Sequence, residues 1–239
     1  MRNFLMLLLG LFTLGLLTSS VIAKAKDGIA VIVVDVQGDF TTAHNGSLAV
    51  PNSDQPYLEK VSEATRQLKS AGLPIFVTQD WHPANHMSFA SNHENRKPFE
   101  TIKLQDGRTQ VLWPPHCVQD TKGAQSLLDP ALITKTIRKG TDHRFDSYSG
   151  FKDDGGAATE LDKALKATGI KKIIVYGIAT DYCVKATVLD ALKDGYAVYV
   201  INDLCRGVAD GTSKSAAEEM TAKGAVIWPS LDIEKVKGL

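Results

Sequence analysis

Cys183 has the surroundings that most suggest chemistry. It stands in the segment GIATDYCVKATVLDA, which follows the apolar run IKKIIVY and opens an amphipathic pattern typical of a helix. The thiol is therefore predicted at a turn between a strand and a helix, where unpaired N–H groups and the helix dipole lower the pKa of a thiol and can hold an oxyanion. This makes Cys183 a candidate nucleophile; the alternative is a buried structural cysteine.

Two further residues are placed to serve such a nucleophile. Asp35 ends the apolar pattern in VVDVQGDF, and burial there would raise the pKa of its carboxyl and suit it to take a proton from a thiol and return it to a leaving group. Lys139 ends a short strand-like run in TIRKGTD, and the glycine after it allows close backbone approach, so its ammonium could hold a carboxylate and a thiolate together. The alternatives are an aspartate that caps a turn and a solvated lysine beside Arg138.

A second group has the residue types of a metal site. Asp80 and His82 lie two apart in TQDWHPANH, and the period of two of an extended segment points both side chains to one side. With His116 from WPPHC they give one carboxylate and two imidazoles, a set that suits zinc, iron or manganese and leaves positions open for water or substrate. For the isolated Asp-x-His pattern the alternative is a surface turn. His86 is a further ligand, a residue that supports the ligands, or a polar loop residue.

These residues need a fold that gathers them. Continuous apolar, β-branched runs alternate with amphipathic patterns, which predicts an α/β fold: a three-layer, open, mostly parallel sheet with helices on both faces. In such sheets ligands bind outside the carboxyl ends of the strands, which is where Asp35, Asp80 and Cys183 fall. The strands are expected at Ile29–Val36, Leu73–Thr78, Lys171–Gly177 and Tyr196–Asn202, and the helices at Tyr57–Ala71, Ala157–Thr168, Asp181–Lys193 and Thr212–Lys223.

The N-terminal residues predict export. An arginine at position 2, an apolar run from Phe4 to Leu17 and small residues up to Ala23 have the pattern of a signal peptide over residues 1–23. The apolar run is shorter than the ~20 residues of a membrane span. Residues 24–239 are then expected to form a single domain, released into a bacterial periplasm without a stable membrane anchor; an uncleaved N-terminal anchor is the alternative.

The composition favours a small-molecule partner. The 239 residues include 27 basic and 27 acidic side chains with no run of one sign, which argues against a nucleic-acid partner. The three cysteines leave at least one thiol unpaired. The sequence leaves open whether Cys117 and Cys205 pair, and whether the protein is a monomer or a homo-oligomer.

Five motifs together resemble the series found in the nicotinamidase/pyrazinamidase branch of the isochorismatase-like cysteine hydrolases. In chain order they are VVDVQGDF, TQDWHPANHMSFAS, LWPPHCVQD, IRKGTDHRFDSYSGF and GIATDYCVKATVLDA. The resemblance spans Ile29 to about Asp203 and implies the isochorismatase-like fold. It also implies that the family's Asp-Lys-Cys catalytic triad falls on Asp35, Lys139 and Cys183.

The resemblance implies a metal centre and a substrate pocket as well. One divalent ion, expected to be zinc with iron or manganese as alternatives, would be held by Asp80, His82 and His116. A cis peptide between Ile178 and Ala179 would turn the N–H groups of Ala179 and Cys183 toward the substrate oxygen as an oxyanion hole. The aromatic lining of the family's ring-binding pocket falls on Phe40, Trp113 and Tyr148.

One position departs from the family pattern. The first motif of the family usually reads D-x-Q-N-D-F, whereas here Gly38 precedes Asp39. An amide that would bond near the water shell of the metal is lost, which leaves the metal affinity and the preferred metal open but not the triad.

The expected activity is a metal-dependent cysteine amidohydrolase that converts nicotinamide to nicotinate and ammonia, and accepts pyrazinamide, through a thioester. The isochorismatase branch lacks the Asp-x-His metal site, so Asp80 and His82 favour the nicotinamidase side. One alternative keeps the fold and the triad for a ureido or carbamoyl amide, whose relatives need no metal. The other is a periplasmic nicotinamide- or metal-binding protein with an oxidised, inactive thiol.

Overall fold

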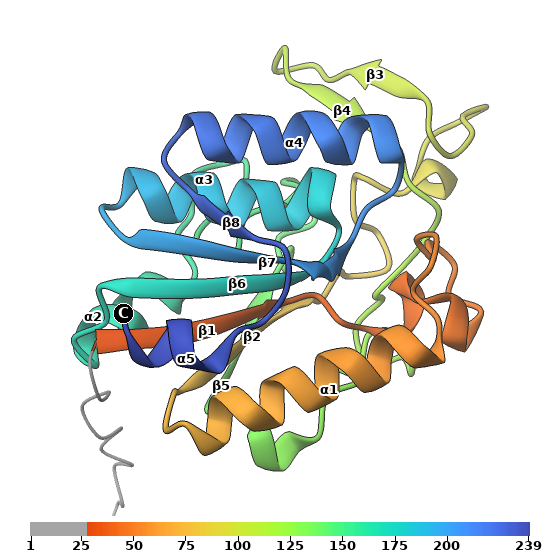
Figure 1. Ribbon diagram of the computed structural model, residues 1–239. Helices are drawn as coiled ribbons and strands as arrows, with labels where there is room; N and C mark the ends of the chain where they lie inside the picture. Colours follow the sequence, from red (N-terminus) through yellow and green to blue (C-terminus); the bar gives the residue numbers. More distant parts are fainter. Residues whose placement is uncertain (1–27) are drawn as a thin grey trace, which may run out of the picture.

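The computed structural model describes residues 28–239, so the signal peptide expected at 1–23 lies outside the described residues. Its centre is one six-stranded sheet in which every neighbouring pair of strands is parallel. This confirms the predicted α/β fold with an open parallel sheet (Figure 1). In spatial order the strands are β5 (Lys135–Lys139), β2 (Ile75–Asp80), β1 (Ile29–Val34), β6 (Lys172–Ile178), β7 (Ala197–Arg206) and β8 (Val226–Trp228).

Helices form the two outer layers. α1 (Gln55–Ser70) and α5 (Ile233–Lys237) lie on one face of the sheet, and α3 (Lys185–Lys193) and α4 (Asp210–Ala222) lie on the other (Figure 1). α2 (Leu161–Ala167) connects β5 to β6, and a right-handed crossover in that direction puts it on the face of α3 and α4. The central strands are covered on both sides, which is why all six residues of β1 are apolar and buried.

Several elements differ from the sequence-based expectation. The helix expected from Ala157 begins only at Leu161, and β7 continues past Asn202 to Arg206. The helix expected from Asp181 begins as a short π-helix, η6 (Thr180–Val184), before α3 takes over. The wider turn of a π-helix places Cys183 in a segment that a regular helical period does not describe, and such turns are frequent at functional sites.

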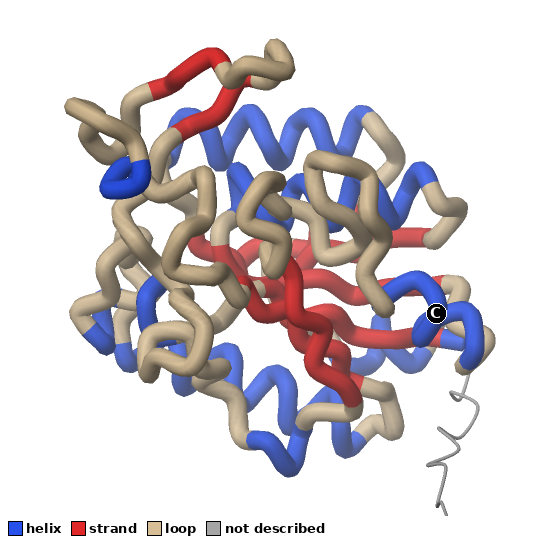
Figure 2. The backbone as a smooth tube through the Cα atoms, turned by 180° about the vertical axis from the view of Figure 1, so that it is seen from behind, coloured by secondary structure: helices blue, strands red, loops and turns tan. Residues whose placement is uncertain are grey.

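The long polar segment between Pro83 and Pro115 contains a small hairpin that the sequence does not reveal. It pairs β3 (Thr101–Lys103) with β4 (Thr109–Val111), and it stands out from the body of the molecule (Figure 1). Loops crowd the carboxyl ends of the central strands (Figure 2). Within residues 28–239, no helix has both the length and the apolar character that crossing a membrane requires.

Candidate active site

Lys139 lies at the centre of the candidate triad. Its ammonium nitrogen is 3.0 Å from Asp35 Oδ2 and donates a hydrogen bond to Cys183 Sγ over 3.5 Å. It also donates to Asp80 Oδ1 at 2.5 Å and to the backbone carbonyl of Ser147 at 2.7 Å. Asp35 and Lys139 are almost completely buried, and Cys183 is 7% exposed. The structure therefore brings together three residues from distant parts of the chain, at positions 35, 139 and 183.

The sheet explains this meeting. Asp80 and Lys139 are direct register partners at the carboxyl ends of β2 and β5, so the lysine side chain starts beside the carboxylate. Asp35 follows β1, the next strand, and Cys183 follows β6 on the other side of β1. At Gly177, a Cβ atom would lie 2.1 Å from the carbonyl oxygen of Val34. Only glycine allows β6 to approach β1 this closely just before Asp35.

Burial and charge set the protonation states of the triad. Burial raises the pKa of the Cys183 thiol well above its ordinary value, and the Lys139 ammonium only partly opposes this. The thiol is therefore neutral at rest, which differs from the lowered pKa expected of a thiol at a helix N-terminus. Burial also raises the pKa of Asp35, against the opposing charge of Lys139. A neutral thiol needs a base, and Asp35 is the carboxylate placed to act as one.

The lysine remains charged in this buried setting. Burial acts to lower the pKa of Lys139, but Asp35 and Asp80 outweigh it and hold the pKa well above its usual value. Burial likewise acts to raise the pKa of Asp80, but Lys139 and then His82 outweigh it, so this pKa is lowered. Asp80 therefore carries its negative charge between the triad and the histidines.

Backbone pairing brings the two histidines of the candidate metal site together. The N–H of His82 donates to the carbonyl of Cys117 at 3.0 Å, and the N–H of Gln119 donates back to the carbonyl of His82 at 2.9 Å. This short ladder places His116 beside His82, with the ring centroids 5.0 Å apart. Asp80, His82 and His116 each offer one ligand atom, and these atoms all lie within 4.8 Å of one another.

The donor atoms of this cluster fit a divalent ion. His82 donates Nδ1–H to the carbonyl of Gly140 at 2.9 Å, and His116 donates Nδ1–H to the carbonyl of Pro114 at 2.8 Å. In its neutral form each ring therefore has the lone pair on Nε2, and each Nε2 faces Asp80 Oδ2, at 3.4 Å from His82 and 4.0 Å from His116. Burial, and then the neighbouring His82, lowers the pKa of His116 to about 4. Such rings, held by backbone carbonyls at the other nitrogen, are typical of metal-binding histidines.

Gly140 makes room for this arrangement. Its φ is +64°, and a Cβ atom there would lie 2.3 Å from Cε1 of His82. The glycine after Lys139 thus serves the metal site, because its carbonyl holds His82 and its missing side chain leaves space for the ring.

His86 lies beside the candidate metal ligands but is not one of the three residues whose ligand atoms cluster. Its ring packs against that of His82 at a tilt of 39°, with the centroids 4.2 Å apart. Its Nδ1 accepts from the backbone N–H of Ser88 at 3.3 Å and pairs with the Ser88 hydroxyl at 2.7 Å, and its Nε2–H donates to the carbonyl of Phe145 at 3.1 Å. With both nitrogens hydrogen-bonded, His86 has the contacts expected of a supporting residue, which is one of the three possibilities that the sequence left open.

The turn before Cys183 has the backbone that the resemblance implies. The peptide bond between Ile178 and Ala179 is cis. The carbonyl of Ala179 accepts from the N–H groups of Tyr182 at 3.1 Å and Val184 at 3.0 Å, which closes the turn tightly. Ala179 and Cys183 both line the cavity described next, where an oxyanion hole would need to open.

A mostly apolar cavity adjoins Cys183. Trp113 donates its indole N–H to the hydroxyl of Tyr148 at 3.1 Å, and the ring of Tyr182 packs edge-on against Trp113 with centroids 5.1 Å apart. The three aromatic residues expected in a ring-binding pocket thus line one cavity, together with an unpredicted one, Tyr182. The lining residues are Phe40, Leu48, Val50, Asp80, Trp113, His116, Asp146, Tyr148, Ala179, Tyr182, Cys183 and Val208.

Three polar residues near the site were not singled out from the sequence. Thr78 donates to Asp35 Oδ1 at 2.6 Å. The side-chain amide of Gln37 makes two hydrogen bonds to the backbone of Asp80, each at 2.9 Å. Its NH2 group donates to the Asp80 carbonyl, and its oxygen accepts from the Asp80 N–H. Asp146 lines the cavity. Thr78 and Gln37 could have been found from the sequence, because each is a polar residue within or directly after an apolar run that predicts burial.

The departure at Gly38 has a steric reason. A Cβ atom at this position would lie 3.2 Å from Cα of Gly123 and 3.3 Å from its carbonyl oxygen, so an asparagine would press on that turn. The neighbouring Asp39 accepts from the N–H of Cys117 at 2.7 Å and thus anchors the segment that carries His116.

All three cysteines, Cys117, Cys183 and Cys205, are free and buried, so Cys117 and Cys205 do not pair.

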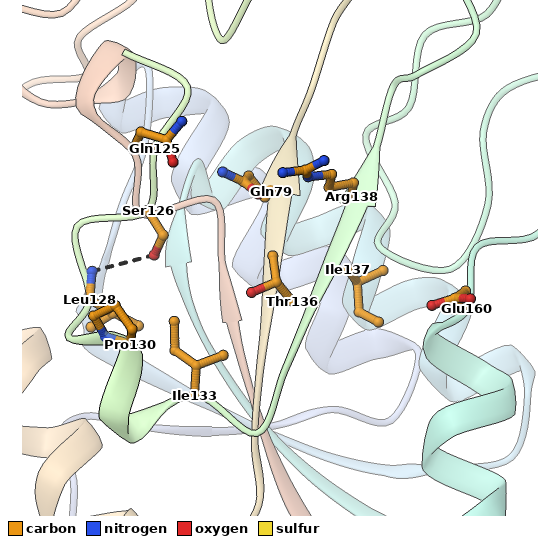
Figure 3. Close-up of a pocket in the computed structure, with 10 residues that line it drawn as sticks. All are labelled: Gln79, Gln125, Ser126, Leu128, Pro130, Ile133, Thr136, Ile137, Arg138 and Glu160. Atoms are coloured by element: carbon orange, nitrogen blue, oxygen red, sulfur yellow. Dashed lines mark hydrogen bonds between the residues drawn. The ribbon is translucent and has the colours of Figure 1, made fainter. Parts of the chain in front are cut away.

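A second, wider cavity of about 600 Å³ lies beside β5 on the edge of the sheet (Figure 3). Its lining includes Gln79, Thr136, Arg138 and Glu160, and the one carboxylate among them is paired with Lys135 at 2.8 Å. It contains none of the candidate triad or metal residues, so the chemistry belongs to the aromatic cavity.

Comparisons with known proteins cover the region that carries these residues. The profile of the isochorismatase domain matches residues 29–230. A nicotinamidase of Acinetobacter baylyi is 45% identical over 207 residues, which cover 84% of this chain and 92% of that protein.

Solved structures give the same picture. The Acinetobacter baumanii nicotinamidase/pyrazinamidase is 41% identical with a TM-score of 0.76, covering 84% of this chain and 96% of that one. The pyrazinamidase of Pyrococcus horikoshii, solved in complex with zinc, is 39% identical with a TM-score of 0.70, covering 84% of this chain and 98% of that one. All five motifs fall within the region that the domain profile matches.

Proposed function

Because this chain belongs to the isochorismatase family of hydrolases, and a relative 45% identical to it is a nicotinamidase, we propose that it hydrolyses nicotinamide to nicotinate and ammonia. It is an amidohydrolase that acts on a small molecule. The observation that carries the proposal is the buried Lys139 ammonium, which contacts Asp35 and Cys183 of the triad at the end of an aromatic cavity.

The first half of the reaction forms a thioester. Asp35 takes the proton of the Cys183 thiol, and Sγ attacks the carboxamide carbon of the substrate. Lys139 stabilises the thiolate as it forms, and the N–H groups of Ala179 and Cys183 stabilise the oxyanion; loss of one such donor costs roughly 3 kcal/mol in other enzymes. Asp35 then gives its proton to the leaving nitrogen, the C–N bond breaks, and ammonia departs.

The second half releases the acid. Water attacks the thioester carbon while Asp35 takes its proton, the C–S bond breaks, and the thiolate recovers a proton from Asp35. The aromatic walls formed by Phe40, Trp113, Tyr148 and Tyr182 hold the flat ring and keep bulk water away from the thiolate.

Asp80, His82 and His116 are the residues that would hold the metal, and we assign zinc to it. When bound, the ion supplies Lewis acidity toward the ring nitrogen, a water molecule, or both. Two supports favour this assignment: the carboxylate and two Nε2 atoms of the cluster suit zinc, and the pyrazinamidase of Pyrococcus horikoshii was solved with zinc.

The test is ammonia release from nicotinamide by protein purified without chelator, beside protein stripped of metal and resupplied with zinc, manganese or iron. We expect turnover of nicotinamide and pyrazinamide, lost on stripping and restored best by zinc. If no metal gives turnover while Cys183 is shown by mass spectrometry to be reduced, the substrate assignment is wrong.

A ureido or carbamoyl substrate on the same triad is the alternative that the same assay addresses. The name of the relative at 45% identity favours the pyridine carboxamide. Metal-independent ammonia release from a ureido compound, with none from nicotinamide, would favour the ureido substrate over the pyridine carboxamide.

Export to a bacterial periplasm is part of the proposal and rests on the N-terminal pattern alone. Expression of the full chain in a Gram-negative host, followed by osmotic-shock fractionation and intact-mass analysis, tests it. A periplasmic product that begins near Lys24 supports export, and a cytoplasmic product of full mass contradicts it.

A further inference from the structure

Asp146 is a buried carboxylate for which the proposed reaction has no role. It is 4% exposed and lines the same cavity as Asp80, His116 and Cys183. Its Oδ2 accepts from the side-chain amide of Gln110 on β4 at 2.7 Å, and its Oδ1 accepts from the N–H of Ser147 at 2.9 Å. Both donors are neutral. Among the described salt bridges, none pairs this carboxylate with a cation.

The residues on either side of Asp146 fix it between the triad and the histidines. The carbonyl of Phe145 accepts from His86, whose ring packs against His82, and the carbonyl of Ser147 accepts from Lys139. The chain at Asp146 is thus held at one end by His86, which lies beside His82, and at the other end by Lys139 of the candidate triad.

The buried carboxylates around the site outnumber the ammonium groups that contact them. Asp35, Asp80 and Asp146 are three buried aspartates that line or adjoin one small region, and Lys139 is the ammonium that contacts the first two. Burying a charge without a partner is costly, and a nearby divalent cation would offset that cost.

We propose that Asp146 raises the affinity of the Asp80–His82–His116 site for a divalent cation through its negative charge, without being a ligand. Gln110 and the N–H of Ser147 occupy one position on each oxygen and hold the carboxylate away from the ligand set. Outer residues that hydrogen-bond metal ligands typically change the metal affinity by about 10–100-fold, and we expect the lower end of that range for a charge that acts through space. The inference rests on the metal site of the proposed function but not on the identity of the substrate.

The test compares zinc affinity, measured by competition with a chromophoric chelator and without any substrate. We expect D146N to bind zinc about 10-fold or more weakly than the unaltered protein. The matched control is D142N, which removes the same charge from the same loop, but at a partly exposed carboxylate paired with Arg144 at 2.6 Å. Its zinc affinity should change by no more than about 2-fold, because exposed charges are screened.

A second variant separates charge from anchoring. Q110M removes the hydrogen bond to Asp146 but keeps the carboxylate, so zinc affinity should stay close to that of the unaltered protein. If D146N does not fold, D146E takes its place and should also retain the affinity because it keeps the charge. Unchanged affinity in folded D146N, or equal losses in Q110M and D146N, or lost affinity in D146E, would each overturn the proposal. The zinc affinities are measured without substrate, so they do not depend on whether the protein hydrolyses nicotinamide. The proposal for Asp146 and the proposal for the substrate can therefore fail independently.

Discussion

At Asp35, burial and two polar neighbours act in opposite directions on one carboxyl group. Burial raises its pKa, whereas the Lys139 ammonium and the hydroxyl of Thr78 lower it. A base must be unprotonated to act, so the acid limb of kcat/KM follows the Asp35 pKa and activity rises with pH through it. We therefore expect Thr78 to shift the pH range of the enzyme, although it is not among the residues that line the cavity.

Replacing Thr78 by valine should move that acid limb to higher pH and lower kcat/KM at acidic pH, since the 2.6 Å bond to Asp35 is lost. The measurement is a pH profile of ammonia release. Thr65→Val is the matched control. Thr65 is also fully buried and hydrogen-bonded, but it lies on α1 and its partner is Tyr176, at 2.8 Å, and not Asp35. If the acid limb of the kcat/KM profile lies at the same pH in T78V as in the unaltered protein, Thr78 does not influence the pKa of Asp35.

At the scale of elements, the end of β5 serves both halves of the site. Lys139 is its last residue, and Gly140 after it holds His82. Gly140→Ala should therefore weaken zinc binding by about 10–100-fold, because the added Cβ would displace the His82 ring.

Gly156→Ala is the matched control for that change. Gly156 also has a positive φ, of +86°, but a Cβ atom there meets nothing within 4 Å. Both variants carry roughly 1 kcal/mol or more of backbone strain, so thermal unfolding of the metal-free proteins should show a loss in each. Zinc titration should separate them, and equal zinc affinities would contradict the role given to Gly140.

The elements that the sequence predicts well are those with a strong period. β1 and β6 are apolar on both faces, so their runs indicate parallel strands directly, and Asp35 and Cys183 follow from where those runs end. The hairpin of β3 and β4 has three residues in each strand, too few for a period. Asp146 lies in a polar loop whose position depends on contacts with Lys139 and Gln110, which no local pattern encodes. The π-helix turn at Cys183 is likewise invisible to a 3.6-residue period.

For the whole molecule, a bound metal links the site to stability. A ligand present at 100 times its Kd stabilises the fold by about 2.7 kcal/mol, which corresponds to a rise in Tm of about 5–10 °C for a domain of this size. Zinc should therefore raise the Tm of the metal-free protein by several degrees. The rise should disappear in His116→Ala and persist in His44→Ala, whose histidine is exposed and outside the cluster. An equal rise in both variants would place the zinc elsewhere.

The most direct test of the whole account replaces Cys183 by alanine and measures ammonia release from nicotinamide, with zinc content and Tm recorded on the same samples. We predict a loss of roughly 1,000-fold or more in kcat, as for other nucleophiles of covalent catalysis, with zinc content and Tm close to those of the unaltered protein. Cys205→Ala, which changes another buried thiol on β7, should retain activity. Ammonia release by C183A at the rate of the unaltered protein would contradict the assignment of Cys183 as the nucleophile.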